Sequence, residues 1–251
     1  MKLQLIRNAT LRLEYAGLNI LIDPMLGPKH SFEAFADSEK NPTVDLPIQM
    51  EQVLRDIDLV IISHLHQDHF DAAAQEVLNK DLPILCQPGD AEKIESYGFE
   101  NVLEIEAHTQ IQEISITRTD GQHGSDEWAE RLNPVSGFVF QAAPEPSLYW
   151  IGDSIWCAEV EQTLAQFTPQ LIVTHSGGAE LGDSGPILMN AEQTLALSQK
   201  YPAAMLIATH MDALDHCKTT RASLRQSADE AGIDDQTLRI PADGEELEWS
   251  K

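Results

Sequence analysis

The chain has 251 residues, and its hydrophobic content of 42% is sufficient for a packed core, which excludes a wholly disordered protein. Its 41 acidic residues outnumber 16 basic residues, which gives a formal net charge of -25. Such a surface repels phosphate groups, so nucleic acid is not expected as a partner, and neither is an anionic membrane surface.

Neither cysteine spacing nor hydropathy indicates a secreted or membrane protein. Cys86, Cys157 and Cys217 are widely spaced and form no CxxC pair, which argues against a disulfide framework or a thiolate zinc site. No apolar run is long enough for a transmembrane helix, and the first residues alternate as a strand does, unlike a secretory signal. We therefore expect a cytoplasmic location and a small-molecule substrate, while the oligomeric state is not predicted.

The N-terminal part is expected to form strands followed by a long loop. Alternating apolar and polar residues predict strands at 3–6 and 10–15, and "LNILIDP" predicts a buried strand that ends at Pro24. Residues 25–47 are rich in Pro, Gly, Ser and Asn and show no period. A loop of this length inside a compact domain is usually functional or mobile.

Apolar runs and helical patterns alternate along the rest of the chain, beginning with a short helix at 52–55 and a strand at 58–63 that is buried on both faces. The later expected elements are helix 71–80, strand 83–86, helix 90–97, strands 102–106, 110–118, 137–142 and 148–152, helix 159–167, strand 170–175, helix 191–200, strand 204–210, helix 220–231, and strands 236–240 and 245–249. No linker or repeat divides the chain, so we predict one domain over residues 1–251, with two packed sheets and helices outside.

The segment "HLHQDH" follows strand 58–63 directly and concentrates three imidazoles and a carboxylate. His64 and His66 lie two residues apart, so their side chains point the same way if the backbone stays extended. Asp68 keeps that direction, and His69 steps to the neighbouring one. Imidazole and carboxylate groups suit zinc, manganese or iron. A purely structural role would leave these groups crowded without purpose, so the segment predicts metal binding.

These four residues cannot fill two metal sites, but further candidate ligands lie at later strand ends. His123 stands in "TDGQHG", Asp153 follows "LYWIG", and His210 ends "AMLIATH". Taken singly, each is more typical of a capped or turn residue than of a ligand. Because each follows a hydrophobic strand as His64 does, together they predict a common rim on a packed sheet scaffold.

This order and spacing of ligands resembles the metallo-β-lactamase superfamily of hydrolases over essentially the whole chain. The N-terminal hairpin and "NILIDPML" are similar to the branch that contains the ascorbate-phosphate lactonases. The resemblance implies an α/β fold, namely an αββα sandwich of two mixed β-sheets with helices on the outer faces and a dinuclear site at one edge. Oxygen-reducing diiron members typically carry Glu where this chain has His66, which favours a hydrolase.

The resemblance also implies the roles of the ligands. The first metal would be held by His64, His66 and His123, the second by Asp68, His69 and His210, and Asp153 would bridge the two metals. Two divalent transition metal ions are therefore the expected cofactors. Zinc is the first expectation, and manganese or iron would also suit these ligands.

The predicted reaction is hydrolysis of a small-molecule ester or lactone by a hydroxide held between the two metals, since metal binding acidifies water. Asp68 is the predicted catalytic residue, because it can accept the proton of the water or orient the hydroxide. A phosphodiesterase is the alternative within enzymes. The alternative outside enzymes is a non-catalytic metal-binding protein that keeps the fold.

Outside the ligand set, two histidines are candidate substrate contacts. His175 ends strand 170–175 before a glycine-rich loop, and His30 lies in the long loop 25–47, where a substrate lid would form. A plain loop histidine is the alternative for each. His216 is a candidate neighbour of the ligands or a solvated residue, and Trp128 is interpreted as a loop anchor in preference to a pocket wall.

Overall fold

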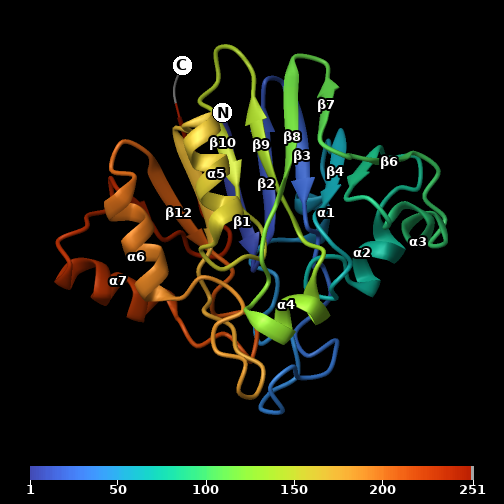
Figure 1. The fold of residues 1–251 in the computed structure, drawn as a ribbon. Coiled ribbons are helices and arrows are strands. Elements are labelled where there is room, and N and C mark those ends of the chain that lie inside the picture. Colours follow the sequence, from blue (N-terminus) through green and yellow to red (C-terminus); the bar gives the residue numbers. More distant parts are fainter. Residues whose placement is uncertain (250–251) are drawn as a thin grey trace.

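The computed structural model describes residues 1–249 as two seven-stranded β-sheets packed face to face, with helices on the outer faces (Figure 1). Each sheet combines antiparallel and parallel strand pairs. This architecture confirms the expected α/β sandwich of two mixed sheets. Within the described residues, no helix combines the length and the apolar character needed to cross a membrane.

The first sheet has the strand order β14-β1-β2-β3-β4-β5-β6. Its strands are β1 (Lys2–Arg7), β2 (Thr10–Tyr15), β3 (Leu18–Ile22), β4 (Leu59–Ile62), β5 (Ile84–Cys86), β6 (Val102–Glu104) and β14 (Glu246–Glu248). The pairs from β14 to β3 are antiparallel, and those from β3 to β6 are parallel. Every residue of β4 is buried, as a continuous apolar run in a parallel sheet predicts.

The second sheet has the order β13-β12-β11-β10-β9-β8-β7. Its strands are β7 (His108–Ile111), β8 (Ile114–Asp120), β9 (Ser136–Gln141), β10 (Leu148–Trp150), β11 (Leu171–His175), β12 (Met205–Thr209) and β13 (Leu238–Arg239). The pairs from β10 to β13 are parallel. The expected strand 110–118 is instead the β7–β8 hairpin, because Gln112 adopts a positive φ of 51° and turns the chain.

Helices cover the outer faces and leave an apolar core between the sheets. They are α1 (Met50–Val53), α2 (Ala72–Val77), α3 (Ala91–Glu95), α4 (Asp126–Leu132), α5 (Ala158–Phe167), α6 (Ala191–Lys200) and α7 (Arg221–Glu230). The core includes the buried side chains of Leu5, Ile20, Phe138, Trp150 and Val173. Burying one such aliphatic or aromatic side chain contributes about 1.5–3 kcal/mol.

Helix α4 was not expected from the sequence, because none of its residues is buried and an apolar period is therefore missing. Its charges nevertheless suit a helix. Asp126 and Glu127 lie in the first turn and Arg131 lies in the last, which complements the helix dipole. The helix lies at the lower end of the view in Figure 1.

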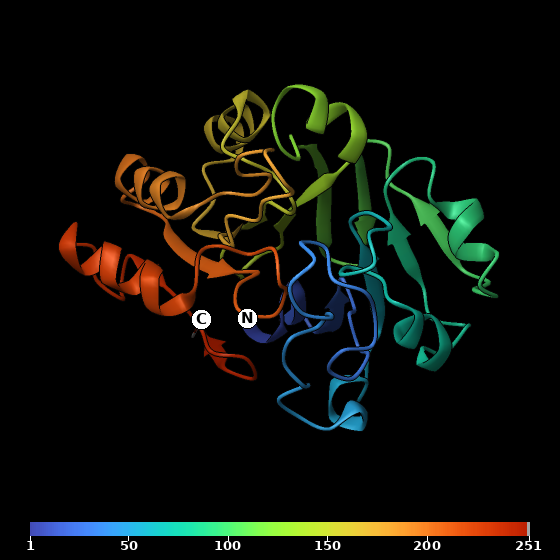
Figure 2. The ribbon, with the colours of Figure 1, turned by 90° about the horizontal axis from the view of Figure 1, so that it is seen from below.

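The C-terminal ends of β4, β11 and β12 lead into loops that gather at one edge of the sandwich (Figures 1 and 2). Arg7 fixes the long N-terminal loop to this edge. Its buried guanidinium donates to the carbonyl oxygens of Val44, Met25 and Gly27 at 2.8–2.9 Å. The segment 25–47 is thus an ordered wall at the edge of the sandwich.

Candidate metal centre

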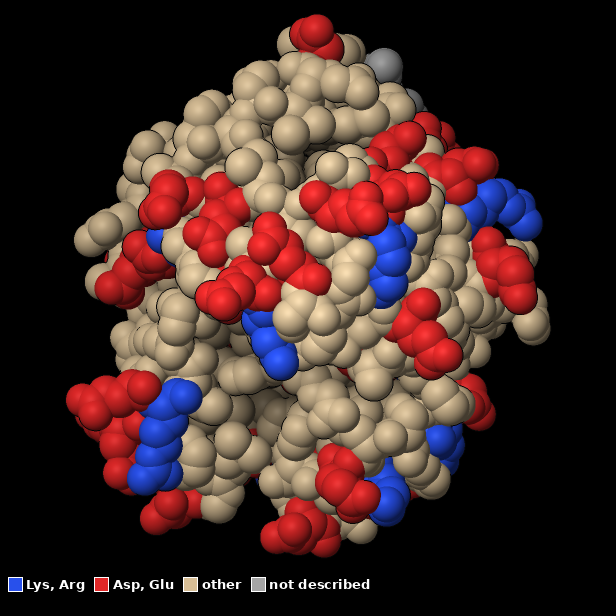
Figure 3. Space-filling model, turned by 90° about the vertical axis from the view of Figure 1, so that its right-hand side faces the viewer, with Lys and Arg blue, Asp and Glu red and all other residues tan. Residues whose placement is uncertain are grey.

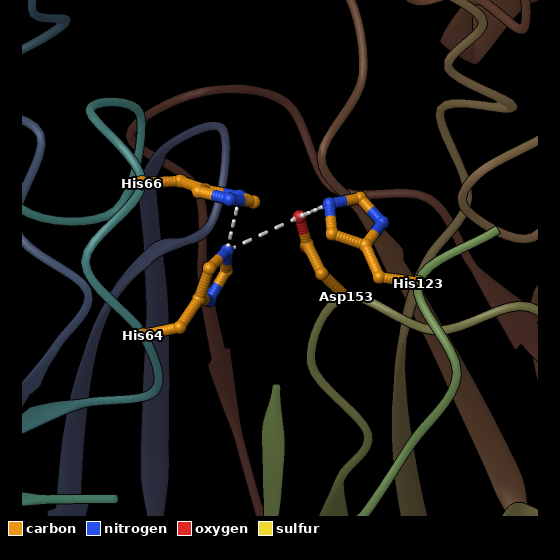
Figure 4. A group of neighbouring side chains, drawn as sticks. All are labelled: His64, His66, His123 and Asp153. Atoms are coloured by element: carbon orange, nitrogen blue, oxygen red, sulfur yellow. Dashed lines mark hydrogen bonds and ion pairs between the residues drawn. The ribbon is translucent and has the colours of Figure 1, made fainter. Parts of the chain in front are cut away.

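The structure brings all seven predicted ligands together at this edge, and the carboxylate of Asp153 lies among the imidazoles. Its Oδ2 atom lies 3.1 Å from His69 Nε2, 3.3 Å from His123 Nε2 and 3.8 Å from His64 Nε2. Figure 4 shows His64 and His66, from the segment after β4, and His123, from the segment after β8, pointing toward this carboxylate. Seven side chains that span residues 64–210 therefore share one small region.

Backbone conformation places two of these ligands. Gly152 has a φ of 76°, and a Cβ there would lie 2.5 Å from the Ser136 carbonyl oxygen, so only glycine allows the turn before Asp153. His210 has a φ of 60°, a left-handed conformation that costs about 1–3 kcal/mol outside glycine. Its backbone N–H donates to the Asn8 carbonyl oxygen at 3.0 Å. Such strain is typical of functional sites.

The ligand atoms form two groups that share Asp153. One group contains His64, His66, His123 and Asp153, and the other contains His69, Asp153, His175 and His210; in each, the ligand atoms lie within 4.8 Å of one another. Asp68 also lies close to the second group, since its Oδ2 atom is 3.2 Å from His210 Nε2 and 3.4 Å from His69 Nε2. Asp153 belongs to both groups, and the first group is the expected one. The second group contains His175, which was not expected as a ligand, and Asp68 lies beside this group and not in it.

The residues fit divalent transition metals. His64 Nε2 and His66 Nδ1 lie 2.8 Å apart, so that two potential ligand nitrogens face each other. His210 Nε2 is buried and makes no hydrogen bond, although a polar atom that is buried without a partner is costly. A cation held by imidazole nitrogens and carboxylates would satisfy all three atoms.

Partners behind the ligands fix the imidazole orientations. Asp23 Oδ2 accepts from His69 Nδ1 at 2.6 Å and from Ser63 Oγ at 2.7 Å, and Ser63 Oγ in turn lies 2.9 Å from His64 Nδ1. His123 Nδ1 donates to the Ile187 carbonyl oxygen at 2.9 Å. These bonds occupy Nδ1 and direct the three Nε2 atoms toward the cluster, as is usual for metal-binding histidines.

Sequence reasoning missed Asp23 and Ser63. Asp23 stands in "LIDP" directly after β3, with a φ of 46°, and is fully buried. An aspartate at the end of a buried strand and before a proline was the available signal. Its partner Ser63 carried no separate signal, because a serine after a strand is common.

The electrostatics of the cluster favour ligation. Burial, together with the neighbouring His69 and His66, lowers the pKa of His64 well below its usual value and favours the neutral imidazole that metals bind. Burial raises the pKa of Asp153, but the imidazoles of His69 and His210 outweigh it, so that this pKa lies well below its usual range. The carboxylate of Asp153 therefore stays ionised.

A cavity of about 180 Å³ opens onto the cluster. It is lined by Phe35, His66, Gln67, Asp68, His123, Leu132, Asp153, Leu181, Ile187 and His216. Among these described residues there is no lysine or arginine, and the walls away from the ligands are largely apolar. Phe35 reaches the cavity from the long loop and packs edge-on against His216, with ring centroids 4.9 Å apart.

The other candidate residues lie at different distances from the cluster. His30 is exposed on the loop, its ring Nε2 lies 2.7 Å from Glu39 Oε1, and it does not line the cavity. His175 is buried, and its ring Nδ1 bonds to Asp153 Oδ1 at 2.6 Å. It does not line the cavity. His216 lines the cavity. Trp128 lies in α4 with the Arg131 guanidinium over its ring.

Comparisons with known proteins identify the family of the chain. Residues 18–211, which contain all seven ligands, match the family model described as "Beta-lactamase superfamily domain". The chain is 34% identical to UPF0173 protein YddR of Bacillus subtilis, over 98% of each chain.

Solved structures show the same fold over the whole length. A possible metal-dependent hydrolase from Veillonella parvula is 33% identical over 98% of each chain, with a TM-score of 0.95. An isothiocyanate hydrolase from Delia radicum gut bacteria is 40% identical over 100% of each chain, with a TM-score of 0.93. From its fold, its ligand cluster and these relatives, the chain belongs to the metallo-β-lactamase superfamily and is one of its metal-dependent hydrolases.

Proposed function

We propose that this chain uses two divalent transition metal ions to hydrolyse a small, neutral and largely apolar electrophile, with isothiocyanates as the first substrate class and esters or lactones as the second. The observation that carries the proposal is the cavity over the ligand cluster. Its apolar walls, from Phe35, Leu132, Leu181 and Ile187, suit an uncharged organic group.

In this proposal His64, His66, His123 and Asp153 hold one metal, and Asp68, His69, His210 and Asp153 hold the other. When bound, such ions acidify a water molecule and polarise the electrophile. Asp68 lines the cavity, and the pKa of its carboxyl lies well below its usual range because His69 and His210 outweigh the effect of burial. The ionised carboxylate can therefore bind metal, accept a hydrogen bond from the attacking water and orient it.

Isothiocyanates come first because a relative that is 40% identical over its whole length is an isothiocyanate hydrolase. The group R–N=C=S is neutral and has an electrophilic central carbon. Water adds to that carbon, one proton of the water moves to nitrogen, and the carbon–nitrogen bond breaks after the second proton follows. The products are the amine R–NH2 and carbonyl sulfide, so atoms and charge balance.

Esters and lactones remain the second candidate, because they too offer a neutral carbonyl carbon to the same attack. Phosphodiesters fit less well. Their charge would meet no cationic side chain in the cavity lining, and the net charge of -25 opposes a polynucleotide. Figure 3 shows one face of the molecule on which acidic side chains clearly outnumber basic ones.

A substrate panel tests the proposal. Protein reconstituted with zinc or manganese is supplied with benzyl isothiocyanate, with simple lactones and with bis-p-nitrophenyl phosphate, and release of amine, carbonyl sulfide, acid or nitrophenol is followed. We expect turnover of the isothiocyanate, of the lactones or of both. Turnover of the phosphodiester alone would contradict the proposal, and no turnover at full metal occupancy would favour a metal-binding role.

Replacing Phe35 with Ala tests the apolar wall. Loss of an aromatic contact costs about 0.5–1.5 kcal/mol, so we expect KM for benzyl isothiocyanate to rise by up to about tenfold. The kcat should change little, because Phe35 lines the cavity but is neither a metal ligand nor a proton acceptor. Phe35→Leu keeps an apolar side chain and should recover most of the loss, whereas equal KM values for wild type and Phe35→Ala would show that this wall does not bind substrate.

A further inference from the structure

We propose that His175 is a positioning residue of the metal centre, which holds the Asp153 carboxylate in the rotation that lets one oxygen serve both groups of ligands. This role rests on the proposed metal centre and not on the choice of substrate. The sequence had suggested that His175 contacts substrate, but its burial and its bond to Asp153 give it a different place.

The contact between His175 and Asp153 defines a donor and an acceptor. His175 Nδ1 lies 2.6 Å from Asp153 Oδ1. An ionised carboxylate only accepts hydrogen bonds, so Nδ1 carries the proton and donates it. Nδ1 is thus engaged as a donor to Asp153 and is not free as a metal ligand. The other ring nitrogen, Nε2, is buried without a hydrogen-bond partner.

This bond matters because the Asp153 backbone alone does not fix the carboxylate. The terminal torsion of an aspartate side chain is broad, so the two oxygens can exchange places or tilt away. With Oδ1 held by His175, Oδ2 lies 3.1 Å from His69 Nε2 and 3.3 Å from His123 Nε2, which belong to different groups. The hydrogen bond therefore selects the orientation that a shared ligand requires.

His175 is itself held rigidly. It is the last residue of β11 and pairs with Thr209 of β12 inside a parallel part of the sheet. Its ring packs edge-on against Trp150 and beside His210, with centroid separations of 4.9 Å in each case. A donor fixed by a strand and two rings can position a carboxylate within the small tolerance that a metal site demands.

The test compares two substitutions by the affinity of the chain for Co²⁺, measured by competition with a chelator, and by the visible spectrum of the Co²⁺-loaded protein. His175→Phe keeps a ring but loses the donor, and we expect an affinity loss of about 10–100-fold with an altered spectrum. His175→Asn places an amide N–H near the position of Nδ1, and we expect affinity within about threefold of wild type. Neither readout needs a substrate, so a wrong substrate assignment would not affect them.

His108→Asn is the control, because His108 is an exposed histidine of β7 and belongs to neither group of ligands. Its metal affinity should stay close to wild type. An equal loss in His175→Asn and His175→Phe would show that His175 is a ligand, and wild-type affinity in His175→Phe would show that it has no role. Either result overturns the proposal. If His175→Phe fails to fold, His175→Val supplies the donor-free comparison.

Discussion

Replacing Asp153 with Ala is expected to abolish detectable hydrolysis and to reduce the bound metal to about one ion per chain or fewer. Its Oδ2 atom lies within 3.8 Å of imidazoles from both groups, so that one substitution removes a ligand from each site. Removing a residue that hydrogen-bonds to a metal ligand typically lowers metal affinity or activity about 10–100-fold. Loss of a ligand that both metals share should exceed that range. Elemental analysis and turnover of the best panel substrate check the two effects together.

Asp120→Ala is the control for this variant. Asp120 is also an aspartate at the end of a strand, but its side chain is 70% exposed and pairs with Arg118 away from the cluster. We expect this control to retain wild-type metal content and turnover. If Asp153→Ala also retained both, Asp153 would not bridge the two metals.

Replacing Asp23 with Ala should lower both the stability of the fold and the affinity for metal. Asp23 accepts hydrogen bonds from Ser63 N, Ser63 Oγ and His69 Nδ1, all in a fully buried environment. Its removal leaves these donors without partners, and breaking a buried charged pair costs about 3–5 kcal/mol. We expect a loss of this size in the free energy of unfolding, measured by urea denaturation of the metal-free protein.

The same variant should bind metal about 10–100-fold more weakly, because His69 and, through Ser63, His64 lose their fixed orientation. Asp58→Ala is the comparison, since Asp58 is a carboxylate of the same sheet whose bonds to Asn19 are exposed. Its unfolding free energy should change by less than about 1 kcal/mol. Equal stability and metal affinity of Asp23→Ala and wild type would contradict the role given to Asp23.

The sandwich and the ligand cluster could be predicted because both depend on short-range patterns. Buried strands such as 58–63 are continuous apolar runs, and the ligands follow such runs directly. Parallel strands of one sheet present their C-terminal ends at the same edge. The face-to-face packing of the two sheets then brings His64, which follows β4 of the first sheet, near His210, which follows β12 of the second.

The cavity walls and the partners of the ligands could not be predicted, because they depend on tertiary packing. Leu132 ends a helix that has no buried residue and therefore no apolar period. Phe35 and Leu181 come from irregular loops, whose approach to the cluster depends on contacts such as that between Phe35 and His216. The orientation of His175 toward Asp153 is a matter of side-chain rotation, on which sequence spacing carries no information.

We propose that one chain holds a pair of metal ions through these seven side chains. The most direct measurement is elemental analysis of protein reconstituted with Zn²⁺, Mn²⁺ or Fe²⁺ and then freed of excess ion. We expect about two ions per chain with at least one of these metals, as in other two-metal sites. A chain that remains metal-free after reconstitution with all three would contradict the claim.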